Sequence, residues 1–471
     1  MISPLHIDLY QLSSLVPHWD SGRGGMPVAM NYFCRRLPKR ELDGAPARGF
    51  LLWVGLRHCL EWLEQARFSE EHIQSLLAHP MIGPALAQRP SLVSALRDWR
   101  FRGRITAPPE GTPLWAGPAT HADGTPLSID GVSPTAMPPF LLIETDLLSA
   151  KLIETPLLSI INHMTMVGTK AAHIVRAAGG KAVLEFGQRR THPLAAVDAA
   201  YAAYIAGVSA TSNVEAWHRW RVPVSGTMDH FAIQAWEQPG VPRHETETAF
   251  FRAFFQDFPK ATALLVDTYD TFGERTGIRA AVAATGGKLQ GIRIDSNLSV
   301  QSLRRARALL DDLGAPQCKI AISGGLDEHA IAALAEAPVD LYGIGERLVT
   351  SSDAPVGVGA VAKLCLVDGQ PTMKLSRGSG KATLPGLVQA WRQGEQDLVG
   401  LREEHHPGTP LLEPVWVDER PLPLPSVHES RALARASLSA LSPESLRPRQ
   451  VTVPVSEGME ALIRSLVRSV A

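Results

Sequence analysis

KAVLEFGQRR, GVSATSNVEAW and RVPVSGTMDHF, at residues 181–190, 207–217 and 221–231, are three successive copies of one pattern. In each copy a short apolar run stops at polar or glycine-containing residues, and a helical pattern follows. The apolar runs span residues 182–186, 205–208 and 222–224. Repeated strand, loop and helix are typical of an α/β domain with a parallel sheet.

The residues directly after these runs are the first candidates for chemistry, because ligands of such domains bind beyond the carboxyl ends of the strands. They provide an aromatic ring, guanidinium groups, hydroxyls, and a histidine beside a carboxylate. They are Phe186, Gln188, Arg189, Arg190, Ala210, Thr211, Ser212, Gly226, Thr227, Asp229 and His230. Such a set predicts a pocket for a flat, anionic, phosphate-bearing substrate.

The alternation continues to about residue 365, with further apolar runs in ATALLVDTYD, GKLQGIRIDS, CKIAIS and VDLYGIG. About seven strands in this length favour a (β/α) barrel over an open sheet. Two late strands end in glycine and are followed by helical text, at Gly324-Gly325 and at Gly345-Glu346. Backbone N–H groups after such turns bind anions, so these residues are candidate phosphate ligands.

The overall composition limits the class of protein. A chain of 471 residues exceeds what one hydrophobic core organises, so we expect two or three domains. The formal net charge of −1 argues against a nucleic-acid or membrane-surface binder. The four cysteines show no paired spacing, which favours a reduced, cytoplasmic protein. We also expect neither a membrane span nor an export signal.

Changes of pattern predict three regions. Residues 1–145 combine helical periodicity with short β runs broken by proline and glycine, which indicates a mixed α and β domain. Residues 146–365 begin with a long helix, for which Gly179 and Gly180 are C-cap candidates, and then form the barrel. Residues 366–471 end in a short strand and an amphipathic helix, and we expect this tail to pack back on the N-terminal domain.

Several side chains carry more than one interpretation. His230 could act as a base, a phosphoryl acceptor or a metal ligand, and Asp229 could orient it. Arg293 and Asp295 point the same way from a strand, where they could bind a phosphate and a ribose or metal, or neutralise each other. Asp267 and Asp270 end a neighbouring strand; the Asp270 carboxylate beside Asp267 would make Mg²⁺ binding plausible.

Phe186 and the arginines after it also allow two interpretations each. The ring of Phe186 could fill the core or stack on a heteroaromatic base. Arg189 or Arg190 could hold a carboxylate or phosphate in a bidentate way, or form a surface ion pair.

Over nearly its whole length, the chain resembles the nicotinate phosphoribosyltransferase family, whose members are type II phosphoribosyltransferases. The matching text is DLYQL (8–12), PEGTPL (109–114), LIETPLLSIINHMT (152–165), FGQRR (186–190), ATSN (210–213), SGT before His230, LLVDTYD (264–270), RIDS (293–296), GIGERLVTS (343–351), and KLS with GKATLPG (374–386). The resemblance implies an irregular α/β barrel with a smaller α+β sandwich domain, in a homodimer. It also implies a ligase-type reaction of NAD salvage: nicotinate and phosphoribosyl pyrophosphate give nicotinate mononucleotide and pyrophosphate, with Mg²⁺ present and ATP hydrolysed.

The same resemblance assigns roles residue by residue. It implies that His230 is the phosphohistidine and that Thr227 and Arg293 contact nicotinate. Phe186 would stack on the pyridine ring, and Tyr10 of the partner subunit would close its other face. The remaining implied contacts are Arg189 and Asp295 for the phosphoribosyl group, Ser212 for the base, and Gly324, Gly325, Gly345 and Glu346 at the phosphates.

Three positions depart from the family pattern. Glu346 stands where the family has threonine, Asn297 replaces a glycine, and Asp229 precedes the histidine where a small residue is usual. These changes keep two other hypotheses open: a phosphoribosyltransferase for another heteroaromatic base, and a non-catalytic paralogue that binds nucleotide. Arg293 favours a carboxylate-bearing base. A Glu346 side chain aimed into a phosphate-sized hollow would favour loss of catalytic function, whereas Glu346 paired with a nearby arginine such as Arg347 would not.

Overall fold

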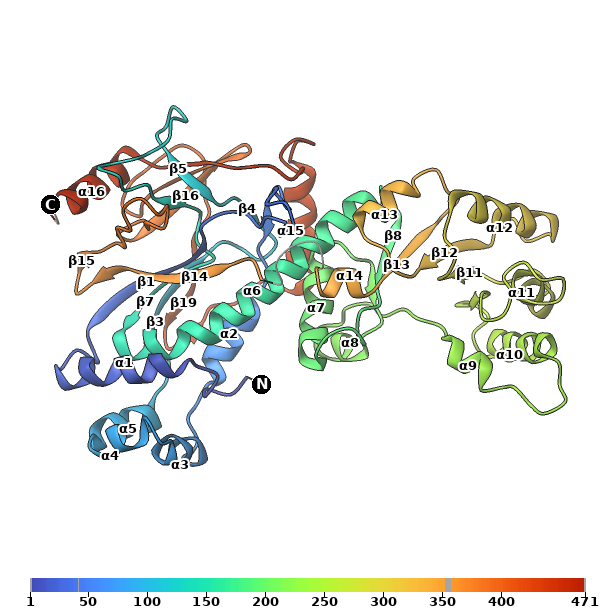
Figure 1. Ribbon diagram of the computed structural model, residues 1–471, viewed down its shortest axis with the longest axis horizontal. Helices are drawn as coiled ribbons and strands as arrows, with labels where there is room; N and C mark the ends of the chain where they lie inside the picture. Colours follow the sequence, from blue (N-terminus) through green and yellow to red (C-terminus); the bar gives the residue numbers. More distant parts are fainter. Residues whose placement is uncertain (1, 41, 352–356, 470–471) are drawn as a thin grey trace. The chain divides into compact units, whose positions relative to one another are not determined.

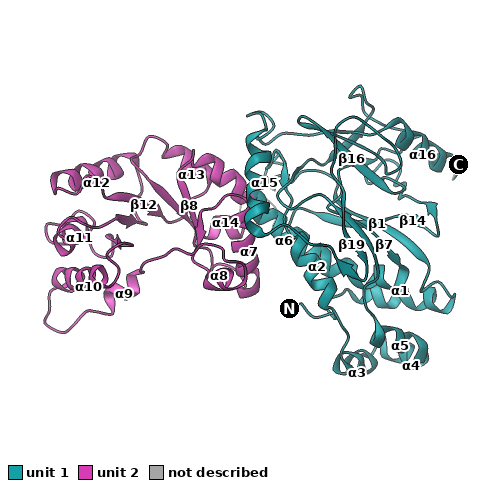
Figure 2. Cartoon of the chain, turned by 180° about the vertical axis from the view of Figure 1, so that it is seen from behind, with its two compact units in different colours: residues 1–169, 353–471 teal, residues 170–352 magenta. Residues whose placement is uncertain are grey.

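The computed structural model describes residues 2–40, 42–351 and 357–469. The chain divides into two compact units, coloured separately in Figure 2. Unit 1 combines Met1–Thr169 with Asp353–Ala471, and unit 2 is Lys170–Ser352. Residues 146–169, which the sequence pattern placed with the barrel, therefore group with the N-terminal part. Unit 1 is the larger of the two, whereas the resemblance implied a smaller sandwich domain.

Unit 1 is organised around a seven-stranded sheet in which every neighbouring pair is antiparallel. Its order is β15-β14-β1-β7-β3-β19-β20. The strands are β1 (Pro27–Cys34), β3 (Gly103–Ala107), β7 (Leu141–Asp146), β14 (Ala360–Val367), β15 (Gln370–Pro371), β19 (Glu413–Asp418) and β20 (Arg420–Pro421). The C-terminal part of the chain thus supplies four strands of a sheet that the N-terminal part begins.

Smaller elements complete unit 1. Short strands form β17-β16-β18, β2-β4 and β21-β5-β6. They are β2 (Leu51–Leu52), β4 (Pro113–Leu114), β5 (Gly117–Thr120), β6 (Thr135–Ala136), β16 (Val388–Gln393), β17 (Gln396–Leu401), β18 (Thr409–Pro410) and β21 (Val453–Pro454). The helices are α1 (Leu9–Asp20), α2 (Leu56–Gln65), α3 (Glu70–Ala78), α4 (Gly83–Ala87), α5 (Pro90–Asp98), α15 (Val427–Ser439) and α16 (Glu457–Arg468).

The long helix α6 (Leu147–Ala177) leads from unit 1 into unit 2. It ends where expected, at Gly179 and Gly180, whose φ angles of 59° and 88° lie in the region that favours glycine.

Unit 2 contains a curled, six-stranded parallel sheet in the order β10-β11-β12-β13-β8-β9 (Figure 1). Its strands are β8 (Ala182–Glu185), β9 (Ala210–Thr211), β10 (Ala263–Leu265), β11 (Gly291–Ile294), β12 (Lys319–Ser323) and β13 (Leu341–Ile344). The helices are α7 (Pro193–Ile205), α8 (Val214–Trp220), α9 (His230–Gln234), α10 (Arg243–Asp257), α11 (Gly277–Thr285), α12 (Val300–Asp312), α13 (Glu328–Ala333) and α14 (Glu346–Val349).

This sheet confirms the predicted α/β class with an irregular barrel, and two details differ from the sequence prediction. The expected strand at residues 205–208 is the end of α7 and a turn, and the strand follows at Ala210–Thr211. The expected strand at residues 222–224 makes only a single parallel bridge, from Val224 to Thr211. The same segment reaches the opposite edge strand, where the Thr227 hydroxyl donates to the Ala263 carbonyl at 2.7 Å. An irregular segment therefore stands between the two sheet edges.

Among the described residues, no helix is long and apolar enough to cross a membrane.

Candidate active site

A hollow of about 860 Å³ lies at the carboxyl ends of the unit 2 strands. It contains aromatic, cationic, hydroxyl-bearing and glycine positions from the turns that follow five of the strands. The lining residues are Phe186, Gln188, Arg189, Arg190, Ser212, Gly226, Thr227, Met228, Asp229, Ala232, Arg293, Asp295, Ser323, Gly324, Gly325, Leu326, Gly343, Gly345, Glu346 and Arg347.

Nearly all of the residues predicted from the sequence therefore meet in one place. His230 is not on the lining but lies directly beside it, next to Asp295. Tyr10 belongs to unit 1, where it lies on α1 with 56% of its surface exposed. Its expected place at the base site remains a prediction.

Phe186 is fixed against the neighbouring strand β13. Its backbone N–H donates to the Ile344 carbonyl at 2.7 Å. Its ring packs on Gly343 so closely that a Cβ at this glycine would lie 2.6 Å from Cε2 of the ring. Glycine at position 343 thus makes room for the ring at the wall of the hollow, and larger residues there would displace it.

Arg293 brings a cation into the hollow from strand β11. One terminal nitrogen, Nη2, donates to the Met228 carbonyl at 2.8 Å, and the buried Nε has no hydrogen-bond partner among the described residues. Burial lowers the pKa of Arg293, while the carboxylates of Asp295 and Asp267 act in the opposite direction. A guanidinium stays charged at neutral pH, so this one has donor capacity left for an anionic ligand.

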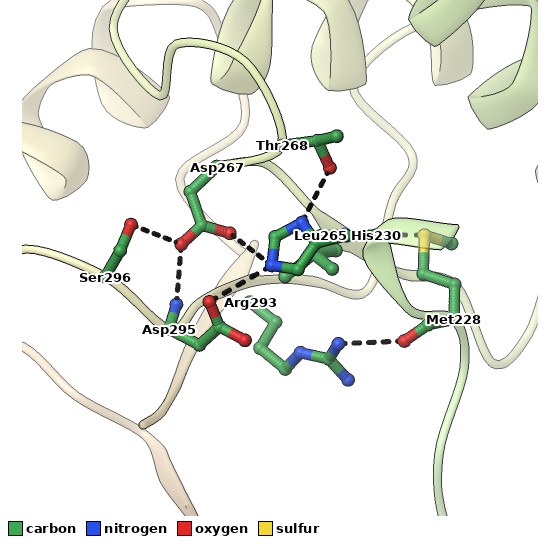
Figure 3. A network of polar contacts seen from close by, with 8 residues as sticks. All are labelled: Met228, His230, Leu265, Asp267, Thr268, Arg293, Asp295 and Ser296. Carbon is green, nitrogen blue, oxygen red and sulfur yellow. Dashed lines mark hydrogen bonds and ion pairs between the residues drawn. The ribbon is translucent and has the colours of Figure 1, made fainter. Parts of the chain in front are cut away.

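His230 lies in a polar network at the ends of β10 and β11 (Figure 3). Its Nε2 is 3.2 Å from Asp295 Oδ1 and 4.0 Å from Asp267 Oδ1, and its Nδ1 is 3.0 Å from Thr268 Oγ1. An ionised carboxylate only accepts hydrogen bonds, so we assign the proton to Nε2. Nδ1 then keeps its lone pair and accepts from the hydroxyl.

Asp267 connects this network to the backbone. Its Oδ2 accepts from the Asp295 N–H at 2.9 Å and from Ser296 Oγ at 2.7 Å. Its other oxygen faces His230 and has no hydrogen-bond partner among the described residues. Burial raises the pKa of Asp267, since only 2% of the side chain is exposed. The orphaned oxygen of a buried carboxyl is suited to a cation or to a protonated imidazole.

These three side chains also form the one group of possible metal ligands within the described part of the chain. Ligand atoms of His230, Asp267 and Asp295 all lie within 4.8 Å of one another. Paired carboxylate oxygens fit Mg²⁺, which prefers oxygen ligands. Of the carboxylates that the sequence offered for a metal, Asp267 and Asp295 are close together, whereas Asp270 is not part of the group. Asp270 instead accepts from the Phe272 N–H at 2.9 Å in a turn.

The departures from the family pattern each have a local explanation. Asp229 does not orient His230; it is the N-cap of α9 and accepts from the Ala232 N–H at 2.9 Å. Asn297 adopts a φ of 52°, a left-handed conformation that asparagine tolerates better than most residues. Glu346 lies at the hollow, with Oε2 3.8 Å from Nε of Arg190, and both side chains are more than half exposed.

The two glycine turns differ in how strictly they require glycine. Gly324 has a φ of 100°, and a Cβ there would lie 2.2 Å from the Asp295 carbonyl oxygen. At Gly345, with a φ of −111°, a Cβ would meet no atom closer than 3.5 Å, so there is room for a side chain. The close approach to Asp295 makes the Gly324 turn a fixed part of the site.

Sequence reasoning missed some of the residues that matter here. Thr268 lies in the LLVDTYD motif, but no role was assigned to it from the sequence. The contact of Asp267 with His230 joins residues that are 37 positions apart in the chain. A signal was present, since Asp267 and Thr268 directly follow the apolar run of β10.

The arrangement of a parallel sheet, glycine turns and a cationic aromatic hollow matches one known class of enzyme domain. Residues 167–355 match the family model described as quinolinate phosphoribosyl transferase, C-terminal domain. Unit 2 and its hollow thus define a phosphoribosyltransferase domain. The crystal structure of human nicotinic acid phosphoribosyltransferase superposes with a TM-score of 0.75 at 28% identity, covering 98% of this chain and 99% of that one.

Relatives of known activity extend this result to the whole chain. The chain is 39% identical to nicotinate phosphoribosyltransferase pncB1 of Mycobacterium tuberculosis over 92% of its length and 87% of the relative. It is 31% identical to the human nicotinate phosphoribosyltransferase, over 98% and 96% of the two chains. The chain belongs to the nicotinate phosphoribosyltransferase family.

Proposed function

We propose that the protein joins nicotinate to phosphoribosyl pyrophosphate, giving nicotinate mononucleotide and pyrophosphate. The observation that carries this proposal is the Arg293 guanidinium, which keeps an unpartnered buried Nε in a hollow that Phe186 also lines. A cation beside an aromatic face suits a planar base with a carboxylate. Membership in the family supports the same substrate.

The base is proposed to lie on the ring of Phe186 with its carboxylate toward Arg293. The Thr227 hydroxyl donates to the Ala263 carbonyl; nicotinate has no hydrogen-bond donor, so a bond from Thr227 to its carboxylate requires the hydroxyl proton to turn away from Ala263. Ser212 lies on the same wall without a charge. This set prefers the acid to its amide, because a carboxylate forms a charge-assisted hydrogen bond with the unpartnered Arg293 Nε that a neutral amide oxygen cannot match.

The phosphoribosyl group is proposed to lie between Asp295, Arg189 and the two glycine turns. The bond between ribose C1 and the pyrophosphate oxygen breaks, and the pyridine nitrogen forms the new bond to C1. Positive charge builds up on the sugar at the transition state, so a carboxylate such as Asp295 near the ribose stabilises it. Mg²⁺, when bound, supplies charge stabilisation to the leaving pyrophosphate; Asp295 and Asp267 are the residues that would hold it.

We further propose that ATP hydrolysis is coupled to the reaction through phosphorylation of His230. Nδ1 is the nucleophile, because Nε2 carries a proton that faces two carboxylates. It attacks the γ-phosphorus, the bond to the bridging oxygen breaks, ADP leaves, and water later releases phosphate from the phosphohistidine. The Thr268 hydroxyl must rotate away from Nδ1 for this attack. The contact of Nε2 with Asp295 orients the imidazole for this attack.

The functional protein is further proposed to be a homodimer in which Tyr10 of the partner subunit closes the base site. The exposure of Tyr10 on α1 leaves its ring available for such a contact. The alternative of a non-catalytic paralogue rested on Glu346 and Asn297. Glu346 lines the hollow, which favours that alternative, and its pairing with Arg190, at 3.8 Å between two exposed side chains, opposes it; Asn297 fits its backbone conformation.

The test is product formation from phosphoribosyl pyrophosphate and Mg²⁺ with nicotinate, nicotinamide or quinolinate, each with and without ATP. The wild type should make nicotinate mononucleotide from nicotinate and be stimulated by ATP. His230→Ala should lose the stimulation, and His329→Ala, which removes an exposed histidine of unit 2, should not. Absence of product from nicotinate would exclude the proposal, and product from another base would support the alternative substrate.

A further inference from the structure

Glu185 is a buried carboxylate at the end of strand β8, directly before the aromatic residue of the base site. It is 0% exposed. Its Oε1 accepts from the Gly187 N–H, and its Oε2 accepts from the side-chain amide of Gln188 and, at 2.6 Å, from the Thr211 hydroxyl. The carboxylate therefore contacts both the turn that carries Phe186 and the end of the neighbouring strand β9.

A second connection joins the same two turns. The side-chain oxygen of Gln188 accepts from Nδ2 of Asn213, and Oδ1 of Asn213 caps helix α8 through the Ala216 N–H at 2.9 Å. The Ser212 N–H donates to the Glu185 carbonyl at 2.9 Å. The backbone and the side chains thus set the distance between Phe186 and Ser212 from both sides.

Among the described residues, Glu185 has no cationic partner. Within the described part of the chain, no lysine, arginine or histidine forms an ion pair with Glu185, and its hydrogen bonds come only from these turns. Burial raises the pKa of Glu185, and the donors of Thr211, Gly187 and Gln188 act in the opposite direction. A buried carboxylate without a cation is costly, so its burial depends on the hydrogen bonds from these donors.

We propose that Glu185 is a positioning residue of the base site, which through Gly187, Gln188 and Thr211 fixes the turn bearing Phe186 relative to the turn bearing Ser212. The inference rests on the proposed function, because its effect on catalysis is measured as the KM for nicotinate. Glu185 touches no reacting group; it acts through the ring and the hydroxyl that the two turns present to the hollow.

Three kinds of variant test this role. Glu185→Gln keeps the shape but places an NH₂ group against at least one of the present donors. Gln188→Met keeps the length of the side chain and removes both amide contacts. Thr211→Val removes the hydroxyl, and Thr211→Ser is the matched control because it retains it.

Two readouts separate positioning from stability alone. The first is hydrogen exchange of the 186–190 amides, compared with those of β11 as an internal control. The second is the KM for nicotinate against kcat. We expect Glu185→Gln, Gln188→Met and Thr211→Val to speed exchange at 186–190 and to raise KM roughly 5- to 20-fold. Thr211→Ser should stay within about twofold of the wild type.

Hydrogen exchange and the KM for nicotinate together decide whether Glu185 is a positioning residue. Unchanged exchange in the variants, or faster exchange with an unchanged KM for nicotinate, would overturn it. If Glu185→Gln does not fold, Gln188→Met and the Thr211 pair give the answer. If the wild type makes no nucleotide from nicotinate, the proposed function fails; the exchange measurements then still show whether Glu185 orders the two turns.

Discussion

Replacing Asp267 by asparagine tests the polar network around His230. Asparagine in the same rotamer keeps one oxygen for the Asp295 N–H and Ser296 Oγ, so the backbone contacts remain. Its amide nitrogen replaces the oxygen that lies 4.0 Å from His230 Nε2. The variant therefore loses one negative charge near the imidazole and sets a donor against the Nε2 proton.

The magnitude follows from the distance. Two unit charges 4.0 Å apart interact by about 4 kcal/mol at an effective dielectric constant of about 20. The His230 side chain is 39% exposed, and solvent screening reduces this to about 2 kcal/mol. Because a phosphorylated or protonated imidazole depends on that charge, phosphoryl transfer from ATP should slow about 30-fold.

The assay is the rate of phosphohistidine formation from ATP labelled in the γ-phosphate, measured in single turnovers. Asp270→Asn is the matched control: it lies three residues away, its oxygen can still accept from the Phe272 N–H, and its rate should equal that of the wild type. An Asp267→Asn protein that is phosphorylated at the wild-type rate would refute the electrostatic reasoning.

Three further predictions concern stability and substrate affinity. Burial raises the pKa of Glu247 to about 7, so between about pH 4.3 and 7 the native state binds more protons than the unfolded chain and stability falls as pH rises. Denaturant titrations should show Glu247→Gln exceeding the wild type by about 1 to 3 kcal/mol at about pH 8, and the two converging below about pH 5. Asn297→Ala should lower the free energy of unfolding by about 1 kcal/mol, whereas Asn297→Gly should be nearly neutral, because only alanine is strained at this φ of 52°. Glu346→Gln should lower the KM for phosphoribosyl pyrophosphate about two- to fivefold, since a partly screened negative charge leaves the hollow; an unchanged KM would mean that Glu346 does not face the substrate.

Much of the site could be predicted because its residues follow strands that are recognisable in sequence. Phe186, Thr227 and Arg293 each come at or after an apolar run, and parallel strands bring such positions to one edge of the sheet. The period-two spacing of Arg293 and Asp295 was enough to place both at the same hollow.

The remaining features depend on contacts that no local pattern encodes. Asp229 looked like the partner of His230 because it is adjacent in sequence, but its own backbone conformation makes it a helix cap. The actual partners, Asp295 and Thr268, come from other strands, and their distances follow from the register of β10 and β11. Glu185 escaped notice because a carboxylate inside an apolar run gives no hint of which donors surround it.

The insertion of unit 2 into unit 1 has a consequence for synthesis on the ribosome. Strand β1 pairs on one side with β7, which follows it within the first 146 residues, and on the other side with β14, at Ala360–Val367. At roughly 5 to 20 residues per second, the chain between these pairing partners takes on the order of tens of seconds to translate. During that interval β1 is an edge strand with open backbone donors, while the parallel sheet of unit 2 emerges complete. Nascent chains stalled before residue 360 should thus be the species most in need of a chaperone.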